Sequence, residues 1–423
     1  MTVKEMNVSL AVSVEEAVER LCAYITAPQV EKIKLETALQ RILAKEFVTP
    51  FPMPPFRRAA MDGYAVRSEL IASAAPDNPV SLTVTGEWKA GKEDEGEWIN
   101  KGVNCVRDSA IRIFTGAPVP EPFDTVVIQE TVKLTQADDD SWIQIDRPCD
   151  LGKHVAEAGE DIAANESLLD VGRSIGVREM AILASYGQDE VSVYKKPVVA
   201  ILPVGDELLE LGEPLQLNHI YDANGMTVYA FASEIGAEVI RYPPIGDRLD
   251  DISEMLEKAL KEADVVITTG GISVGDYDFV ARSAEYIGCE PVFTKVWMRP
   301  GTPSSAFVRD SRLIISLSGN PSACYSGLEL LVKPVLLKLI GHEQYRSQWA
   351  EGYLDAAIDK PCPYPRYIRS VVRLSASGWR ITPLSNDRSG NIAAFAKATA
   401  LAIIPPGGKG ATVGQIVHFI PLT

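Results

Sequence analysis

Apolar side chains recur at helical spacing near the start of the chain. They lie three and four positions apart across residues 14–25, where Ser13 and Glu16 form a capping-box pattern, and again across residues 35–43. This spacing predicts two short helices. Four of the six residues at 50–55 are then proline, which excludes a helix or a central strand. The proline segment therefore indicates a crossing into another domain.

The pattern changes to short strands after the proline segment. Between residues 80 and 145, strand-like stretches alternate with turns, which predicts a small all-β domain. Helical spacing returns at residues 177–186. We therefore expect the chain to rejoin its N-terminal helices there, so that the all-β domain is an insertion.

Strands and helices alternate from residue 197 onward. Buried strands are predicted at 197–205, 238–246 and 264–269. A helix over 224–235 and a second helix, with Asp247 as its candidate N-cap, separate these strands. Alternation at this length implies a parallel sheet with helices on both faces.

The whole pattern predicts a multidomain chain of α/β and β parts. A long helix is expected from Pro321, and beyond Gly341 short strands alternate with turns. The expected domains are a helical, elongated domain 1 (1–48 with 150–195), an inserted β-domain 2 (49–149), a central doubly wound α/β domain 3 (196–343) and a C-terminal β-domain 4 (344–423). A length of 423 residues agrees with two to four domains, because one hydrophobic core rarely serves so long a chain.

Composition and charge narrow the function. A net charge of −16 argues against a general binder of nucleic acid or of membrane surfaces, because phosphates and anionic lipids would be repelled. The sequence shows no apolar leader and no run of membrane-spanning length, so we expect a cytoplasmic protein. The six cysteines are widely spaced without a CxxC pattern, and the four histidines lie far apart. Carboxylates, hydroxyls and cations are therefore the expected chemical groups.

A glycine pair follows the strand predicted at 264–269. Gly270 and Gly271 allow positive φ, so that backbone N–H groups can turn toward one oxyanion. Ser273 adds a hydroxyl donor, and Gly275 leaves the wall of the loop low. This stretch predicts a seat for a phosphate or a similar anion, although a plain glycine-rich turn is the simpler alternative.

Carboxylates follow three of the predicted strands. Asp206 and Glu207 follow the first, Asp247 follows the second, and Asp276 and Asp278 follow the third. Ligands of such sheets lie at the carboxyl ends of the strands, so these groups are expected to converge in one crevice. Carboxylate oxygens suit Mg²⁺ together with substrate phosphates. The simpler alternatives are helix caps at Asp247 and Asp278.

Cations and a second anion seat are predicted further along. Lys295 and Arg299 alternate with apolar residues, which places both on one face of a strand. The turn Ser318-Gly319-Asn320 precedes the helix from Pro321, whose N-terminus favours an anion.

Two residues of the β-domain carry chemistry that local patterns leave open. Asp62 precedes Gly63 in a tight turn, and Thr115 presents a hydroxyl in the rigid segment TGAPVP. In isolation, turn chemistry and a strand cap explain them.

These motifs together resemble the molybdopterin molybdenumtransferase family (molybdenum insertases), to which the C-terminal domain of gephyrin also belongs. The resemblance spans nearly the whole chain, in the family's order: AMDGYAV at 60–66, TGAPVP at 115–120, AGEDI at 158–162, GDEL at 205–208, GGISVGDYDF at 270–279, KVWMRPGTP at 295–303 and SGNPSA at 318–323.

The resemblance implies a molybdopterin-binding domain 3, a β-barrel-like domain 4 and a homodimer. It implies insertion of molybdate into adenylylated molybdopterin, with Mg²⁺ required and AMP released. Molybdopterin adenylyltransferase and molybdoenzyme apoproteins become candidate partners.

The resemblance also implies roles for individual residues. The proposed catalytic carboxylates are Asp62, Glu207, Asp247 and Asp278, of which the last three serve the metal-assisted cleavage. Anions are seated by the glycine loop with Lys295, Arg299, Ser318 and Asn320. Asp62 and Thr115 act in trans, from the β-domain of the other subunit. Arg369 and Ser389 match positions that domain 4 offers to molybdate.

Four positions depart from the family pattern. Ser318 replaces a proline, Val204 a threonine, Arg299 a lysine, and Arg57-Arg58 an aspartate-asparagine pair. Two alternatives stay open beside the insertase: a gephyrin-like scaffold without catalysis, and an adenylyltransferase acting one step earlier. The complete set of carboxylates argues against the scaffold, and the β-domain argues against the adenylyltransferase.

Overall fold

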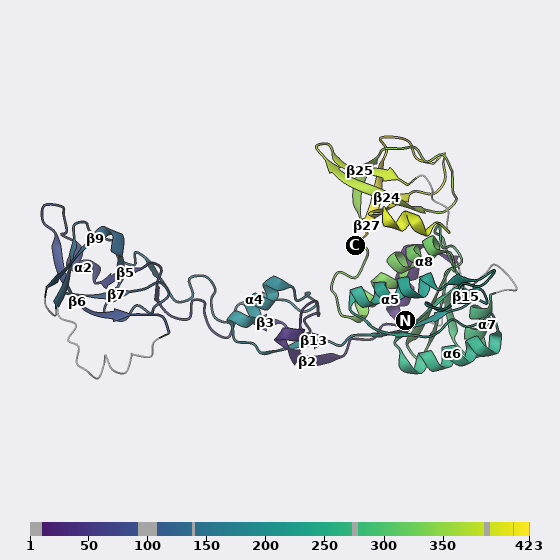
Figure 1. Cartoon of the computed structure of the whole chain (residues 1–423), viewed down its shortest axis with the longest axis horizontal. Coiled ribbons are helices and arrows are strands. Elements are labelled where there is room, and N and C mark those ends of the chain that lie inside the picture. Colours follow the sequence, from purple (N-terminus) through teal and green to yellow (C-terminus); the bar gives the residue numbers. More distant parts are fainter. Residues whose placement is uncertain are drawn as a thin grey trace. The chain divides into compact units, whose positions relative to one another are not determined.

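A computed structural model describes residues 11–91, 108–137, 140–272, 278–384, 390–408 and 410–422. Its packing divides the chain into two compact units (Figure 1). One unit is Glu46–Asp170, and the other joins Met1–Lys45 to Val171–Thr423. The finer division into four domains stays a prediction.

The unit Glu46–Asp170 is built on one mixed sheet, as expected for the β-domain. In spatial order, its strands are β8 (Thr125–Ile128), β5 (Gly63–Val66), β7 (Ser109–Ile113), β6 (Val80–Trp88), β10 (Asp140–Ile145) and β9 (Val132–Ala137). β6 and β7 run parallel, and all other neighbours run antiparallel. Apolar side chains from the sheet form two buried clusters, and one short helix, α2 (Ser68–Ile71), packs with them.

Short antiparallel pairs bring the two ends of this unit together. They are β3 (Phe47–Val48) with β12 (Ser167–Leu169), and β4 (Arg58–Ala59) with β11 (Val155–Ala156). The outgoing and returning chain therefore run side by side, as an insertion requires.

In the other unit, a small layer joins the early and middle parts of the chain. β2 (Val30–Lys34) pairs antiparallel with β13 (Glu190–Tyr194), and the predicted helix near 177 is α4 (Val177–Ser185). The helix predicted over 35–43 is wrong. Only one turn of 3-10 helix, η2 (Leu35–Thr37), forms there.

Two features explain why that helix stops. Gln40 has φ of 64°, which a right-handed helix excludes. Ile42 and Leu43 then form antiparallel bridges with Ser174 and Val193. Pairing with the returning chain thus outweighs the helical spacing.

The α/β part carries the predicted sheet, with an antiparallel edge. In spatial order, its strands are β17 (Glu238–Arg241), β14 (Val198–Pro203), β18 (Val265–Thr269), β22 (Arg312–Leu317), β21 (Ser305–Arg309) and β19 (Glu290–Phe293). The first four are parallel, and the last two are antiparallel to their neighbours.

Helices cover both faces of this sheet, as doubly wound folds require. On one face lie α1 (Val14–Ala23), α5 (Ala223–Ile235), α8 (Pro321–Gly327), the π-helical η4 (Leu328–Val332) and α9 (Lys333–Leu339). On the other lie α6 (Leu249–Glu262) and α7 (Phe279–Tyr286). Alternate strand residues serve the two faces: Val199 and Ile201 one, Ala200 and Leu202 the other.

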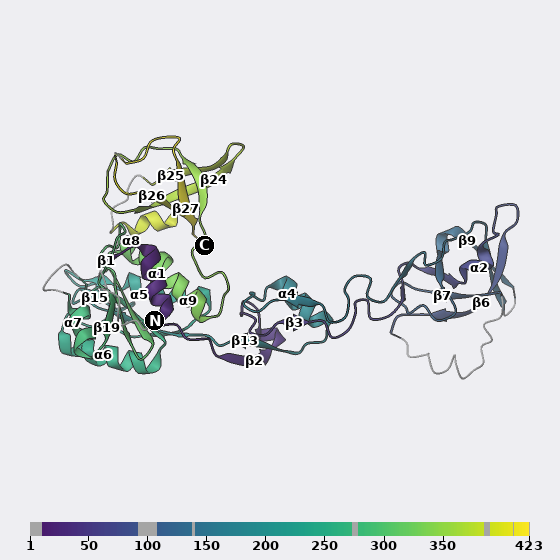
Figure 2. The same cartoon turned by 180° about the vertical axis from the view of Figure 1, so that it is seen from behind.

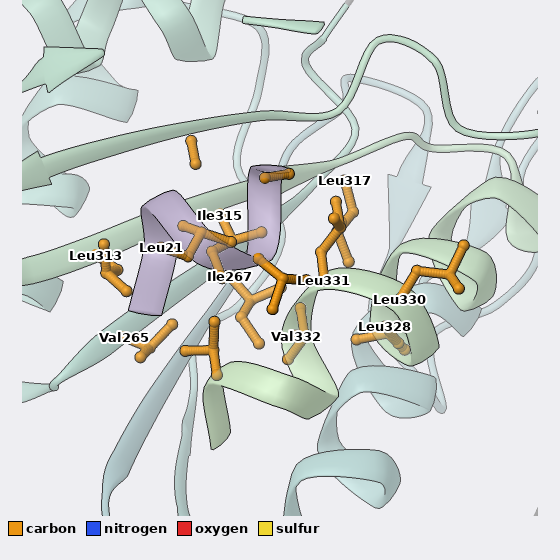
Figure 3. Packing of buried hydrophobic residues seen from close by; sticks show 14 of the residues in the cluster. Leu21, Val265, Ile267, Leu313, Ile315, Leu317, Leu328, Leu330, Leu331 and Val332 are labelled. Carbon is orange, nitrogen blue, oxygen red and sulfur yellow. The ribbon is translucent and has the colours of Figure 1, made fainter. Parts of the chain in front are cut away.

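The N-terminal helix is part of this core. Ser13 caps α1 by accepting the Glu16 N–H at 3.1 Å, as predicted. Figure 2 shows α1 in purple beside α9, and Figure 3 shows Leu21 among Val265, Ile267 and Ile315. The strand β1 (Ala11–Val12) before α1 runs parallel to β20 (Lys295–Val296).

The C-terminal part is a closed five-stranded barrel, which confirms the predicted β-domain. Its strands are β23 (Ala350–Leu354), β25 (Gly378–Pro383), β24 (Arg366–Ser375), β26 (Ala400–Ile404) and β27 (Ile416–Pro421), in barrel order. A 3-10 helix, η5 (Ile392–Ala396), precedes β26. Among the described helices of the chain, none is long and apolar enough to cross a membrane.

Candidate functional site

The glycine pair after β18 adopts the predicted backbone conformation. Gly270 and Gly271 have φ of 81° and 63°. A Cβ on Gly270 would stand 2.2 Å from the carbonyl oxygen of Val204, and one on Gly271 would stand 2.7 Å from Cγ1 of Val204. Only glycine therefore fits both positions. Ser273 and Gly275 lie outside the described residues.

These contacts also account for Val204, one of the departures from the family pattern. Val204 is 1% exposed, and its methyl group packs on the backbone of Gly271. A buried valine side chain thus replaces a polar one where the loop passes closest.

The turn before α8 lies against the glycine loop. The Gly270 N–H donates to the Leu317 carbonyl at 3.0 Å, and a Cβ on Gly319 would stand 3.5 Å from the Gly270 Cα. Ser318 is 8% exposed, and its Oγ accepts the Asn320 N–H at 3.3 Å. The start of α8 and the glycine loop therefore form one surface at the carboxyl ends of β18 and β22.

Carboxylates after two neighbouring parallel strands come together at the same edge of the sheet. The Asp247 N–H donates to Asp206 Oδ1 at 3.2 Å. Burial raises the pKa of Asp247, and the negative charges of Asp206 and Glu207 raise it further. The three carboxylates therefore repel one another, and a bound proton or cation relieves that repulsion.

Asp247 does not cap α6, contrary to the simpler alternative. The helix begins at Leu249, and Arg248 occupies the N-cap position without a side-chain capping bond. The backbone N–H of Asp247 donates to the carboxylate of Asp206 instead. The predicted cap was wrong because a contact 41 residues away determines the position.

Asp278 does cap its helix. Its Oδ1 accepts the Ala281 N–H at 3.1 Å at the start of α7, and burial raises its pKa. Asp276 lies outside the described residues. Within the described part of the chain, no three His, Cys, Asp or Glu side chains are placed to hold a metal.

The chemistry of Asp206, Glu207 and Asp247 nevertheless fits Mg²⁺. Their oxygens are the hard ligands that this ion prefers, and their mutual repulsion raises the affinity for a cation. Asp278 contributes a further carboxylate after the next strand, already engaged by one backbone N–H.

Lys295 and Arg299 are not on one regular strand, contrary to prediction. β20 ends at Val296, the Met298 N–H turns back to the Val296 carbonyl, and Arg299 precedes a cis proline. The alternation survives because Val296 and Met298 are fully buried while the two cations are exposed. Among the described residues, neither cation has an ion-pair or hydrogen-bond partner for its side chain.

A cleft of about 1390 Å³ joins the α/β part to the barrel. Arg299, Ser318 and Asn320 line its α/β side, and the barrel contributes residues 356–364 and 383–384 with Arg366 and Ile368. The bond between the Arg299 N–H and the Pro365 carbonyl, at 3.0 Å, connects the two walls. Sequence reasoning missed the barrel wall, because that segment carries no motif.

Arg369 lies on β24 and does not line this cleft. It is 3% exposed, its Nη1 donates to the Asn391 carbonyl at 2.5 Å, and its guanidinium stacks 5.3 Å from the Phe395 ring centroid. Ser389 lies outside the described residues. Their implied contact with molybdate stays a prediction.

In the unit Glu46–Asp170, the structure joins the two blocks that carry Asp62 and Thr115. Asp62 Oδ1 accepts both the backbone N–H and the hydroxyl of Thr115, at 2.8 and 2.7 Å. The backbone donor, followed by the hydroxyl donor, lowers the pKa of Asp62. Both residues are exposed, so Asp62 presents an ionised carboxylate on the surface of this unit.

The arginine pair that departs from the family pattern has local roles. Arg57 forms ion pairs with Glu121 at 2.9 Å and with Glu157 at 3.2 Å. Arg58 pairs through its backbone in β4 and bridges to Pro118, in the block that carries Thr115.

Family models match most of the chain. They are described as the MoeA N-terminal region (domain I and II) at residues 12–187, a "Probable molybdopterin binding domain" at 200–338, and the MoeA C-terminal region (domain IV) at 351–422.

Relatives and solved structures agree with these models. A molybdopterin molybdenumtransferase of Bacillus subtilis is 36% identical over 97% of this chain and 94% of its own length. One of Staphylococcus epidermidis is 34% identical over 97% of this chain and 95% of its own length. The molybdopterin biosynthesis MoeA protein of Pyrococcus horikoshii superposes with a TM-score of 0.83 at 28% identity, covering 97% of this chain and 99% of that one. The chain therefore belongs to the molybdopterin molybdenumtransferase (MoeA) family.

Proposed function

We propose that this protein transfers molybdenum from molybdate into adenylylated molybdopterin, releases AMP and depends on Mg²⁺. The observation that carries the proposal is the pair of exposed cations, Lys295 and Arg299, which have no partner among the described residues. Arg299 lines the cleft together with Ser318 and Asn320 at the start of α8. The names of the relatives support the same reaction.

The charge balance of the chain favours an anionic ligand at this place. With a net charge of −16, the protein repels anions in general, so two cations without a side-chain partner in the described part of the chain favour an anionic ligand there. Molybdate and the substrate phosphates are all anions. Lys295, Arg299 and the glycine loop bind and orient them, and the α8 N-terminus adds favourable N–H groups.

The carboxylates at the neighbouring strand ends have a separate role. Glu207 and Asp247, with Asp206 beside them, would hold Mg²⁺, and Asp278 is the further proposed ligand. When bound, Mg²⁺ supplies charge neutralisation at the phosphate link to AMP. The carboxylates would position the Mg²⁺ ion, and Lys295 and Arg299 orient the anionic groups of the substrates.

A homodimer completes the proposal. Asp62 and Thr115 lie on the unit Glu46–Asp170, and we assign them to the site of the other subunit. The lowered pKa keeps Asp62 ionised at neutral pH, so it acts as an acceptor rather than as a donor. A cytoplasmic location suits a protein that exchanges substrate with other cofactor-synthesis enzymes.

The proposal is tested by incubating the purified protein with adenylylated molybdopterin, Mg²⁺ and molybdate. We expect AMP release that rises with molybdate concentration and falls to background without Mg²⁺. A folded protein that binds the substrate and releases no AMP would instead be a scaffold. AMP release that does not depend on molybdate would indicate a hydrolase instead.

A further inference from the structure

A second, smaller hollow of about 390 Å³ adjoins the cleft. It lies where the start of α1, the loop after β20 and the barrel segment before β24 meet. Its walls are aromatic rings and prolines: Trp297, Tyr364 and Tyr367 with Pro363, Pro365 and Pro406. Among the described residues, the polar groups of its lining are Ser13 and Glu15 at the start of α1, the tyrosine hydroxyls and the indole N–H of Trp297.

Trp297 is exposed yet fixed in position. Its backbone N–H donates to the Val12 carbonyl at 2.7 Å, and its neighbours Val296 and Met298 are fully buried. The residue is 43% exposed and lines the hollow. A large ring held on a rigid backbone with a free face is typical of a stacking platform.

The hollow is continuous in lining with the anion-binding cleft. Pro363 and Tyr364 line both spaces, while Trp297 lines the hollow and Arg299, two residues later, lines the cleft. Lys295, two residues before Trp297, is also exposed. In the sequence, Trp297 is therefore flanked by two exposed cations whose side chains have no partner among the described residues.

This arrangement selects a particular kind of ligand. A planar ring that enters the hollow stacks on Trp297, and a phosphate attached to that ring reaches the cations. The volume suits one ring system rather than a whole cofactor. Glu15 at the rim offers an acceptor to an exocyclic amine, which adenine and pterin both carry.

We infer that the hollow binds a planar heteroaromatic ring of the substrate, adenine or pterin, by stacking on Trp297, with the attached phosphate at Arg299. The identity of the substrate rests on the proposed function; the ring-binding role of the hollow does not. Trp297 is then a determinant of ring affinity beside the residues that handle the oxyanion.

The test measures ring binding separately from phosphate binding. Isothermal titration of the intact protein in Mg²⁺ buffer compares AMP with ribose 5-phosphate, which carries the phosphate without the base. Wild type is compared with Trp297→Leu, which keeps an apolar side chain and loses the flat face. Trp349→Leu is the matched control, because Trp349 is 57% exposed, stacks on His418 and does not line the hollow.

In the adenine arm, Trp297→Leu is expected to weaken AMP binding by about 5- to 150-fold, the range of base–aromatic stacking. Ribose 5-phosphate affinity stays unchanged, and Trp349→Leu matches wild type with both ligands. In the pterin arm, 6-hydroxymethylpterin is titrated in the same way. Loss with the pterin alone assigns the hollow to the pterin ring, and loss with AMP alone assigns it to adenine.

Equal affinities of wild type and Trp297→Leu for both AMP and the pterin would overturn the inference. Circular dichroism spectra that match wild type establish that the variant is folded. The proposed function fails separately, if wild type releases no AMP in the molybdate assay. These two failures are distinguishable, because the titrations require no turnover.

Discussion

Gly270→Ala tests how tightly the glycine loop is held against the neighbouring strand end. The substitution adds a Cβ at a residue with φ of 81°, which costs about 1–2 kcal/mol in left-handed backbone. That Cβ would stand 2.2 Å from the Val204 carbonyl oxygen, so the loop or the strand end must move. Overpacking of this kind costs about 1–3 kcal/mol. We expect a total loss of about 2–5 kcal/mol in the free energy of unfolding.

Gly288→Ala is the matched control for this prediction. Gly288 has φ of 82°, and no described atom lies within 4 Å of the place its Cβ would take. It shares the backbone strain and the change in unfolded-state entropy, and it lacks the clash. Its expected loss is about 1–2 kcal/mol.

Urea denaturation followed by circular dichroism gives both free energies, provided that the slopes with urea agree. Phosphate binding gives a second readout, since movement of Gly270 displaces the N–H groups of the loop. We expect Gly270→Ala to lose affinity for AMP and Gly288→Ala to keep it. Equal stability losses and equal AMP affinities in the two variants would refute the reasoning, because the close approach to Val204 would then carry no cost.

Four further predictions concern single side chains. Asp247→Asn should keep wild-type stability, because Asp247 caps no helix, while AMP release at limiting Mg²⁺ falls steeply; a wild-type rate would remove Asp247 from the metal site. Lys295→Ala and Arg299→Ala should each raise the molybdate concentration for half-maximal release and leave folding nearly intact, since neither side chain has a partner among the described residues; an unchanged molybdate dependence in both would make them ordinary surface charges. Thr115→Val should raise the Asp62 pKa measured by carboxyl NMR, with the backbone donor retained. Because the folded-state pKa of Asp62 is lowered, this bond stabilises the fold above the unfolded-state pKa, and the stabilisation is lost as pH falls through the folded-state pKa. An unchanged Asp62 pKa in Thr115→Val would show that the hydroxyl does not lower it. Mixing inactive Asp62→Ala with inactive Asp278→Ala subunits should restore part of the activity in heterodimers; verified exchange without recovery would reject the shared site.

Local rules carried the prediction of the sheet and its glycine loop. The strand before Gly270 and the amphipathic helices could be predicted because each pattern depends on residues only a few positions apart. The positive φ of Gly270 and Gly271 followed from residue type alone. The helix predicted over 35–43 failed where pairing with Ser174 and Val193 determined the structure.

Contacts between distant parts of the chain could not be predicted from local sequence patterns. The bond between Asp62 and Thr115 spans 53 residues, and local patterns alone explained Asp62 as turn chemistry and Thr115 as a strand cap. The predicted cap at Asp247 was wrong for the same reason, because the Asp247 N–H donates to Asp206 instead. The barrel wall of the cleft and the aromatic hollow at Trp297 depend on how the barrel packs on the α/β part, which no local pattern encodes.

The central claim is that molybdenum enters the substrate as AMP leaves. The most direct measurement quantifies both products of one incubation with adenylylated molybdopterin, Mg²⁺ and limiting molybdate: AMP by chromatography, and pterin-bound molybdenum by elemental analysis after unbound molybdate is removed. We expect equal molar amounts of AMP and pterin-bound molybdenum, both rising with molybdate concentration. AMP released without molybdenum on the pterin would contradict it.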